Sequence, residues 1–264
     1  MKSVSLSPSF TDIIEKLGRG DRLTGITDHC EEIREDIAKI GSPKALNMAQ
    51  IEALKPDLIF ADLNENRPEE LRLLQKQFKV ISFDVRSVPA VLETIRVIGQ
   101  HVEAIPEAVK LAEEIAKEKD AAQESAKEIE PVRTLILLWN TPYLTINFDT
   151  YISRLVETCG GYNIFHSDPL REFPVEIEDM IDNNPGLVLL PRAPYPFKKA
   201  HIARFRQYRI FSKVRIEMID GKLFSYFGPK TADALKKLSA LIVDTAKDPS
   251  LFSGTVPKSG DSPL

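Results

Sequence analysis

The chain has 264 residues, enough for one large domain or two small ones, of which 43% are hydrophobic and 28% are charged. This composition is typical of a folded globular protein and excludes a disordered or membrane-embedded chain. The 35 basic and 39 acidic residues are distributed along the chain and leave a net charge of −4, so no basic stripe is present to neutralise nucleic-acid phosphates.

The first hundred residues repeat a short strand, a turn and a helix, which is typical of an α/β lobe. Gly18 ends the first predicted helix, and Lys55-Pro56 ends the second because the residue before proline avoids the α region. We expect strands at Val4–Leu6, Leu23–Ile26, Asp57–Ala61 and Lys79–Phe83, and helices from an N-cap at Ser9 or Thr11 to Leu17, at Asn47–Leu54 and at Glu69–Gln77.

A long segment rich in Ala, Glu and Lys follows, from Pro106 to Glu130. Proline suits the first turn of a helix, and Pro131 ends the segment. Apolar residues keep a helical spacing of three or four along one stripe, while charged residues cover the other faces. We therefore expect one long helix that links two lobes.

The α/β rhythm resumes after this helix. We expect strands at Arg133–Trp139, Leu187–Leu190 and Ile210–Met218, helices at Tyr151–Thr158 and Pro229–Thr245, and a turn at Asp220–Gly221 leading into Leu223–Ser225. The tail from 248 to 264 is rich in Ser, Gly and Pro, which predicts disorder. The predicted fold class is α/β: two lobes, at 1–105 and 131–247, each with a short, mainly parallel sheet flanked by helices, joined by the helix at 106–130.

The start of the chain, MKSVSLSPSFTD, lacks the apolar core of a signal peptide, and no window approaches the roughly 20 apolar residues of a membrane-spanning helix. As written, the chain is expected in the cytoplasm, whereas a chain trimmed of its signal peptide would be periplasmic or surface-anchored. Cys30 and Cys159 fall in different predicted lobes, so two buried free thiols are expected in preference to a disulfide.

Five phrases occur in order along the chain: VSLSPSFTDIIEKLG, LTGITDHC, LNMAQIEALKPDLIFA, WNTPYLTINFDTYISRLVETCGGYNIF and IDGKLFSYFGPKTADAL. Together they resemble the helical-backbone metal receptor family, the class III periplasmic-type substrate-binding proteins, with the cobalamin-binding branch nearest, and the resemblance covers residues 3–245. The resemblance implies two lobes about a rigid helix, a ligand in the cleft between them and only small opening motions. It also implies a metal chelate as the ligand, such as cobalamin or a related corrinoid.

Loops that follow strands line such clefts, so the candidate site residues lie in turns. Ser7-Pro8-Ser9 follows the first strand, where backbone N–H groups at a helix start either favour a ligand amide, carboxylate or phosphate or form an ordinary N-cap. His29 follows the second strand and is expected to stack on the ligand, hydrogen-bond to it or ligate its metal, or else to lie in a plain surface loop. Related binders often carry tryptophan where this chain has Pro43 and Asp62, so it departs from that aromatic lining.

The candidates in the second lobe are mainly aromatic. Trp139, the only tryptophan, ends a predicted strand, and its indole suits the face of a flat macrocycle if it is not a core side chain. Arg192 differs, since its guanidinium suits a carboxylate or phosphate substituent. Aromatic loops with few charges suit a large planar ligand better than a naked ion. The other candidates are Tyr143, Phe165, His166, Phe173, Tyr195, Tyr226 and Phe227.

Importer-bound relatives dock on arginines of a membrane permease through one acidic residue on each lobe, so the resemblance implies an ABC permease as a partner. Glu65, Glu69 and Glu70 lie near the expected place in the first lobe. Ser225 occupies the matching position in the second lobe, where the carboxylate is missing.

The leading hypothesis is a monomeric binding protein, not an enzyme, that carries cobalamin or a related corrinoid and uses no catalytic cofactor or metal ion. It would serve an ABC importer or be a cytosolic relative. An iron siderophore or haem on the same frame is one alternative. A chelatase or corrinoid-modifying enzyme is another, with His29 and either Asp28 or Asp62 as its candidate set. A protein-interaction module whose cleft binds no small molecule is the third.

Overall fold

The computed structural model describes residues 1–30 and 34–251. The chain forms two compact units. The N-terminal unit comprises residues 1–116 together with 226–229, and the C-terminal unit comprises residues 117–225 and 230–251. A four-residue segment near the end of the chain thus belongs to the N-terminal unit.

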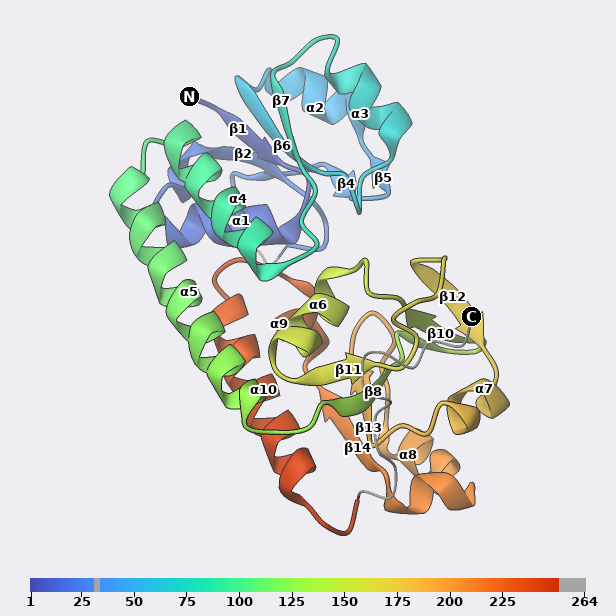
Figure 1. Ribbon diagram of the computed structural model, residues 1–264. Coiled ribbons are helices and arrows are strands. Elements are labelled where there is room, and N and C mark those ends of the chain that lie inside the picture. The colour runs from blue at the N-terminus through green and yellow to red at the C-terminus, as the bar shows by residue number, and fades with distance from the viewer. Residues whose placement is uncertain (31–33, 252–264) are drawn as a thin grey trace. The chain divides into compact units, whose positions relative to one another are not determined.

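The N-terminal unit is built on a five-stranded sheet in the order β3-β2-β1-β6-β7 (Figure 1). All of its pairs are parallel, which requires each strand to return through a crossover segment. The strands are β1 (Ser3–Ser5), β2 (Leu23–Ile26), β3 (Ala38–Lys39), β6 (Leu58–Asp62) and β7 (Val80–Phe83), and a separate antiparallel pair is formed by β4 (Gly41–Ser42) and β5 (Ala45–Leu46).

Helices cover both faces of this sheet, because successive side chains of a strand point to opposite faces. Val4 and Leu6 of β1 and its following turn pack in a core cluster with Ile51 and Leu71, which lie on two of the helices. On the other face, the ring of Phe10 lies 5.2 Å from that of Phe83. The helices are α1 (Pro8–Lys16), α2 (Met48–Leu54), α3 (Pro68–Leu74) and α4 (Val88–His101), with a short 3₁₀ turn at Gly20–Arg22.

Helix α5 (Ile105–Lys127) is a continuous helix of 23 residues that begins in the N-terminal unit and ends in the C-terminal unit. Ala108, Leu111, Ala112 and Ile115 are buried along one stripe. Charged side chains occupy much of the rest of its surface. The amphipathic pattern therefore predicted this helix to within three residues at either end.

The C-terminal unit has a four-stranded parallel sheet in the order β11-β8-β13-β14 and a three-stranded antiparallel sheet in the order β12-β10-β9. The parallel strands are β8 (Val132–Ile136), β11 (Gly161–Asn163), β13 (Leu187–Pro191) and β14 (Arg215–Ile219). The antiparallel strands are β9 (Trp139–Asn140), β10 (Tyr143–Ile146) and β12 (Glu172–Val175).

Alternation along β8 and β13 divides the core of the C-terminal unit into two layers. Leu135 and Val188 face a cluster that contains Met180 and Phe205, on the side of α7 and α8 (Figure 1). Helices α6 and α10 lie on the other side of the sheet (Figure 1). The helices are α6 (Tyr151–Thr158), α7 (Ile177–Asp182), α8 (Lys199–Phe205), α9 (Gly221–Ser225) and α10 (Thr231–Lys247), with a 3₁₀ segment at Arg209–Lys213.

The predicted α/β class, with parallel sheets flanked by helices, is confirmed. Both cysteines are free and buried, as expected. The expected N-cap at Ser9 or Thr11 is wrong, because α1 begins two residues earlier behind Ser7. Helix α4 was not predicted, although Ser87 caps it by accepting a hydrogen bond from the amide of Ala90. The predicted disordered tail at 248–264 falls largely on residues 252–264, which lie outside the described residues, whereas residues 248–251 form a turn in which the amide of Leu251 donates to the carbonyl oxygen of Asp248.

Two further predictions near the end of the chain are wrong. The expected strand at 210–218 begins only at Arg215, because Phe211 enters the core from a 3₁₀ segment. The expected turn at 220–221 and the segment that follows it form helix α9, whose first turn is capped by a hydrogen bond from the amide of Leu223 to Oδ1 of Asp220. In each case a local hydrogen bond or a core contact outweighs the apolar pattern.

A glycine at the contact of α4 and α5 generates a prediction about stability. A Cβ atom added at Gly99 would lie 2.3 Å from Cβ of Ala108. We expect Gly99→Ala to lower the free energy of unfolding by about 1–3 kcal/mol through overpacking, although alanine favours helix by about 1 kcal/mol.

Urea denaturation measures this effect. The exposed Gln100→Ala on the same helix is the control and should change the free energy of unfolding by less than about 0.5 kcal/mol. The double variant Gly99→Ala/Ala108→Gly should recover part of the loss, and a Gly99→Ala protein as stable as the wild type would contradict the packing argument.

Candidate functional site

Loops of the N-terminal unit meet where the parallel strands β1, β2 and β6 end, because the carboxyl ends of parallel strands share one edge of a sheet. Ser7-Pro8-Ser9 follows β1, His29 lies in the turn after β2, and Asp62 ends β6. The structure thus assembles the first-lobe candidates of the sequence analysis at one edge. His29 is exposed, whereas the other members are buried.

The side chains of the Ser7-Pro8-Ser9 turn are engaged within the protein. Ser7 is the N-cap residue of α1, but its hydroxyl makes no capping bond and donates to Oε2 of Glu65 at 3.0 Å. Oγ of Ser9 accepts the backbone N–H of Phe227 at 3.2 Å. These two side chains therefore hold loops together and offer a ligand little unsatisfied hydrogen-bonding capacity.

Asn66 connects three loops at this edge. Its Nδ2 donates to the carbonyl oxygens of Leu6 at 3.1 Å and Pro43 at 3.0 Å, and its Oδ1 accepts the amide of Asp62 at 2.7 Å. The side chain is only 3% exposed, and Pro43 is buried beside it. The sequence offered no signal for this role beyond a polar run after a buried strand.

Two carboxyl groups, the buried Asp62 and the half-buried Glu65, lie in the same loop. Asp62 is 2% exposed, and burial, reinforced by the charge of Glu65, raises its pKa to about 7 despite a hydrogen bond from the amide of Asn64. Burial also raises the pKa of Glu65, opposed by the hydrogen bond from Ser7 and by the charges of His29 and Lys44. The edge therefore holds one carboxyl group whose pKa lies near neutral pH and a second whose pKa is raised.

The three carboxylates predicted for permease docking differ in their surroundings. Glu65 is bonded to Ser7, and Oε1 of Glu70 accepts the amide of Leu46 at 3.3 Å. Glu69 is exposed in the first turn of α3. Glu69 is therefore the most accessible of the three.

Aromatic rings cluster where β8 and β13 of the C-terminal unit end. Trp139, on β9, is 39% exposed, and its ring lies 5.2 Å from that of Tyr195 in an edge-to-face arrangement. The ring of Tyr195 also contacts those of Phe197 at 4.8 Å and His201 at 5.5 Å. We call Trp139, Tyr195, Phe197 and His201 the aromatic platform. Sequence reasoning named its first two members and missed the other two, which lie beyond the strand end in a loop and in α8.

The remaining second-lobe candidates divide between core and surface. Tyr143, on β10, is half-buried with its ring 5.5 Å from that of Phe205, and burial raises its pKa. Phe173 is buried in the core, with Phe165 packed edge-to-face on it at 5.7 Å. Arg192 is exposed after β13.

Tyr226 and Phe227 belong to the N-terminal unit. Tyr226 is half-buried, whereas Phe227 is buried with its ring 5.6 Å from that of Phe10. Phe227 thus packs as a core residue of a unit other than the predicted second lobe.

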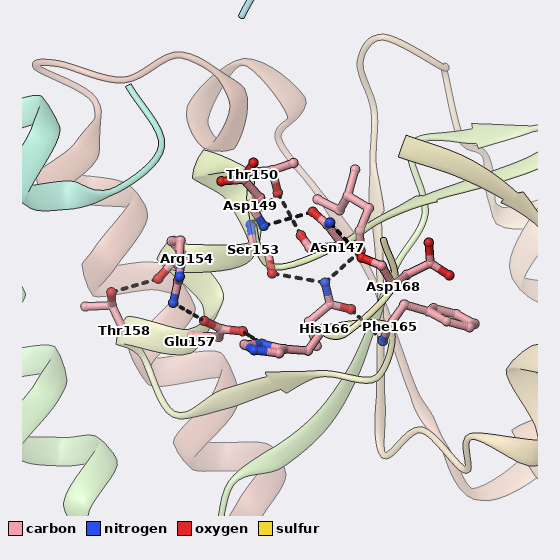
Figure 2. A network of polar contacts seen from close by, with 12 residues as sticks. Asn147, Asp149, Thr150, Ser153, Arg154, Glu157, Thr158, Phe165, His166 and Asp168 are labelled. Atoms are coloured by element: carbon pink, nitrogen blue, oxygen red, sulfur yellow. Dashed lines mark hydrogen bonds and ion pairs between the residues drawn. The ribbon is translucent and has the colours of Figure 1, made fainter. Parts of the chain in front are cut away.

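His166 lies in a polar network of the C-terminal unit (Figure 2). Its Nδ1 lies 2.6 Å from Oε1 of Glu157, whose other oxygen lies 3.4 Å from Nη1 of Arg154. The imidazole also stacks on Phe148 at 5.0 Å and Tyr162 at 5.8 Å. The structure thus places His166 with these residues and does not bring it to the aromatic platform.

Two cavities of the C-terminal unit lie away from the aromatic platform. One, of about 760 Å³, is lined by His166, Glu157, Tyr162 and residues of α5. The other, of about 460 Å³, is lined by Arg133, Arg209 and other residues near the amino ends of β8 and β14. Among residues 1–30 and 34–251, no group of three or more His, Cys, Asp or Glu side chains is arranged to hold a metal ion.

No helix within the described ranges has both the length and the apolar character needed to span a bilayer. A model of the periplasmic binding protein family matches residues 4–215, which is most of the chain. The chain therefore belongs to this family.

Named relatives and solved structures agree with this assignment. The vitamin B12-binding protein of Pectobacterium atrosepticum is 25% identical over 257 residues, which cover 94% of this chain and 90% of that protein. The periplasmic vitamin B12-binding protein of Vibrio cholerae has a TM-score of 0.81 at 20% identity, covering 94% of this chain and 98% of that one. The periplasmic heme-binding protein of Roseiflexus sp. RS-1 has a TM-score of 0.80 at 23% identity, covering 93% and 99%. These two structures show that the chain has the same two-lobed fold.

The raised pKa of Asp62 predicts a pH-dependent stability. Because its folded-state pKa lies above that of the unfolded chain, the protonated carboxyl stabilises the fold at low pH, and this contribution is lost as the pH rises through about 7. Asparagine keeps the acceptor for the amide of Asn64 but carries no charge. We expect Asp62→Asn to be stabilised relative to the wild type by roughly 2 kcal/mol more at pH 8 than at pH 5.

Urea denaturation at the two pH values measures this difference. Asp182→Asn, at an exposed site at the end of α7, controls for the loss of one negative charge. The same stability difference between wild type and Asp62→Asn at both pH values would show that Asp62 ionises as freely in the fold as in the unfolded chain.

Proposed function

We propose that this member of the periplasmic binding protein family is a substrate-binding protein that carries cobalamin or a related corrinoid. The observation that carries the proposal is the aromatic platform, where an exposed indole and a phenol form an apolar surface with a polar edge. Such a surface suits a large planar ligand. Relatives 25–26% identical to the chain and named as vitamin B12-binding proteins support the choice of cobalamin.

Haem is the second candidate ligand. The structural likeness to a heme-binding protein is as close as that to the vitamin B12-binding protein, with TM-scores of 0.80 and 0.81. A flat porphyrin would use the same aromatic platform. Direct competition between the two chelates therefore decides between them.

Trp139 is the only tryptophan in the chain, so its fluorescence reports on the platform itself. We expect cyanocobalamin to quench this fluorescence saturably and to bind more tightly than haemin in isothermal titration calorimetry. We expect Trp139→Ala to weaken cyanocobalamin binding by about tenfold or more through the lost aromatic contact.

Leu73→Ala is the control for the loss of an exposed apolar side chain, because Leu73 is 49% exposed on α3, outside the candidate loops. It should leave the affinity unchanged. Haemin binding more tightly than cyanocobalamin would replace the ligand assignment, and failure of both chelates to bind would overturn the proposal.

We propose binding, and not catalysis, also because the enzyme alternative needs His29 and a carboxylate to act together on a metal. Asp62 is buried and hydrogen-bonded in its own loop, while Asp28 and His29 are exposed. As a family member that delivers its ligand to an ABC permease from the periplasm, the chain would present Glu69 as its accessible acidic docking residue.

A further inference from the structure

His201, a member of the aromatic platform, forms hydrogen bonds both with the start of helix α8 and with the hydroxyl group of Tyr195. It lies in the first turn of α8 and is half-buried. The backbone N–H of Lys198 donates to its Nδ1 at 2.8 Å, which makes His201 a cap for the start of the helix. Its Nε2 lies 3.2 Å from the hydroxyl oxygen of Tyr195. One imidazole thus joins the helix start to the platform.

These contacts assign the tautomer of His201. A backbone N–H can only donate, so Nδ1 must be an unprotonated acceptor. The carbonyl oxygen of Lys198, 3.2 Å from Nδ1, would need a proton on that atom and is therefore not its partner. In the neutral ring the proton lies on Nε2, which donates to the oxygen of Tyr195.

This tautomer of His201 determines how the hydroxyl group of Tyr195 can form hydrogen bonds. Its hydroxyl oxygen accepts from His201, so its own proton is available to another acceptor, and the hydroxyl has no other hydrogen-bond partner among the described residues. Tyr195 packs edge-to-face on the exposed ring of Trp139. The platform therefore has a donor held in place at its edge.

We infer that His201 is a positioning residue that makes the Tyr195 hydroxyl a fixed hydrogen-bond donor to an oxygen atom of the bound ligand. The inference rests on the proposed function, because it takes the aromatic platform as the ligand surface. The acceptor is an amide, phosphate or carboxylate oxygen at the rim of a planar chelate. Arg192 and Lys198, both exposed in the same region of the chain, favour an oxygen that carries negative charge.

Two substitutions at position 201 each remove one of the two hydrogen bonds of the imidazole and keep the other. The amide oxygen of asparagine takes the place of Nδ1 and keeps the cap, but asparagine has no donor at the place of Nε2. The amide nitrogen of glutamine takes the place of Nε2 and keeps the donor to Tyr195, but glutamine loses the cap. His201→Asn and His201→Gln are therefore a matched pair.

We expect Tyr195→Phe to weaken cyanocobalamin binding, or haemin binding if that is the tighter ligand, by about tenfold. His201→Asn should weaken it by a similar factor, and adding it to Tyr195→Phe should cause no further loss. His201→Gln should keep most of the affinity while lowering the melting temperature, because only the helix cap is lost. Calorimetric titration and thermal unfolding of the full chain measure the two effects separately.

Equal affinity loss in His201→Asn and His201→Gln would show a purely structural role and overturn the inference. So would multiplicative losses in the Tyr195→Phe/His201→Asn double variant. Nitrogen NMR of the ligand-free chain is independent of the ligand and should show the proton of His201 on Nε2. A proton on Nδ1 would overturn the inference even if both chelates bind, whereas failure of all chelates to bind overturns the proposed function and leaves this assignment of the tautomer standing.

Discussion

Parallel pairing of short strands is the constraint on which both units depend. Each strand of a parallel sheet ends beside the ends of its neighbours, so loops from distant parts of the chain meet at one edge. In the N-terminal unit this brings Ser7, His29 and Asp62 together. Backbone groups in such loops have no ladder partners and must be satisfied by side chains or water. Asn66 satisfies three of them at once.

The same edge also contains two carboxyl groups whose removal from water is energetically unfavourable. Asp62 and Glu65 are carboxyl groups in one loop, and burial raises the pKa of both. Burying charged groups costs stability unless partners compensate, and here the Ser7 hydroxyl and the Asn64 amide compensate only in part. Carboxyl groups with shifted pKa values are concentrated at functional sites, where folded proteins tolerate a local loss of stability.

The loop edge of the C-terminal unit consists mainly of aromatic side chains and not of buried polar groups. A small antiparallel sheet after β8 places Trp139 opposite Leu144 and leaves the indole partly exposed. The loop after β13 supplies Tyr195 and Phe197, and α8 supplies His201. The polar side chains that hold this surface form hydrogen bonds in fixed directions, so the platform combines apolar area with a directed donor.

The sequence by itself determined the α/β class, the long helix, which was predicted at 106–130 and is found at 105–127, and most strands of the two parallel sheets, because apolar period and charge pattern are local signals. It also identified Trp139 and Tyr195 as members of a candidate surface. Only the tertiary structure decided that Ser9 and Phe173 are engaged in the interior, that His166 pairs with Glu157, and that Asn66 and His201 position other groups. These roles arise from contacts between residues that lie on different elements or in irregular loops. A periodic pattern carries no information about such contacts, because it reports which face of an element is buried and not what lies against it.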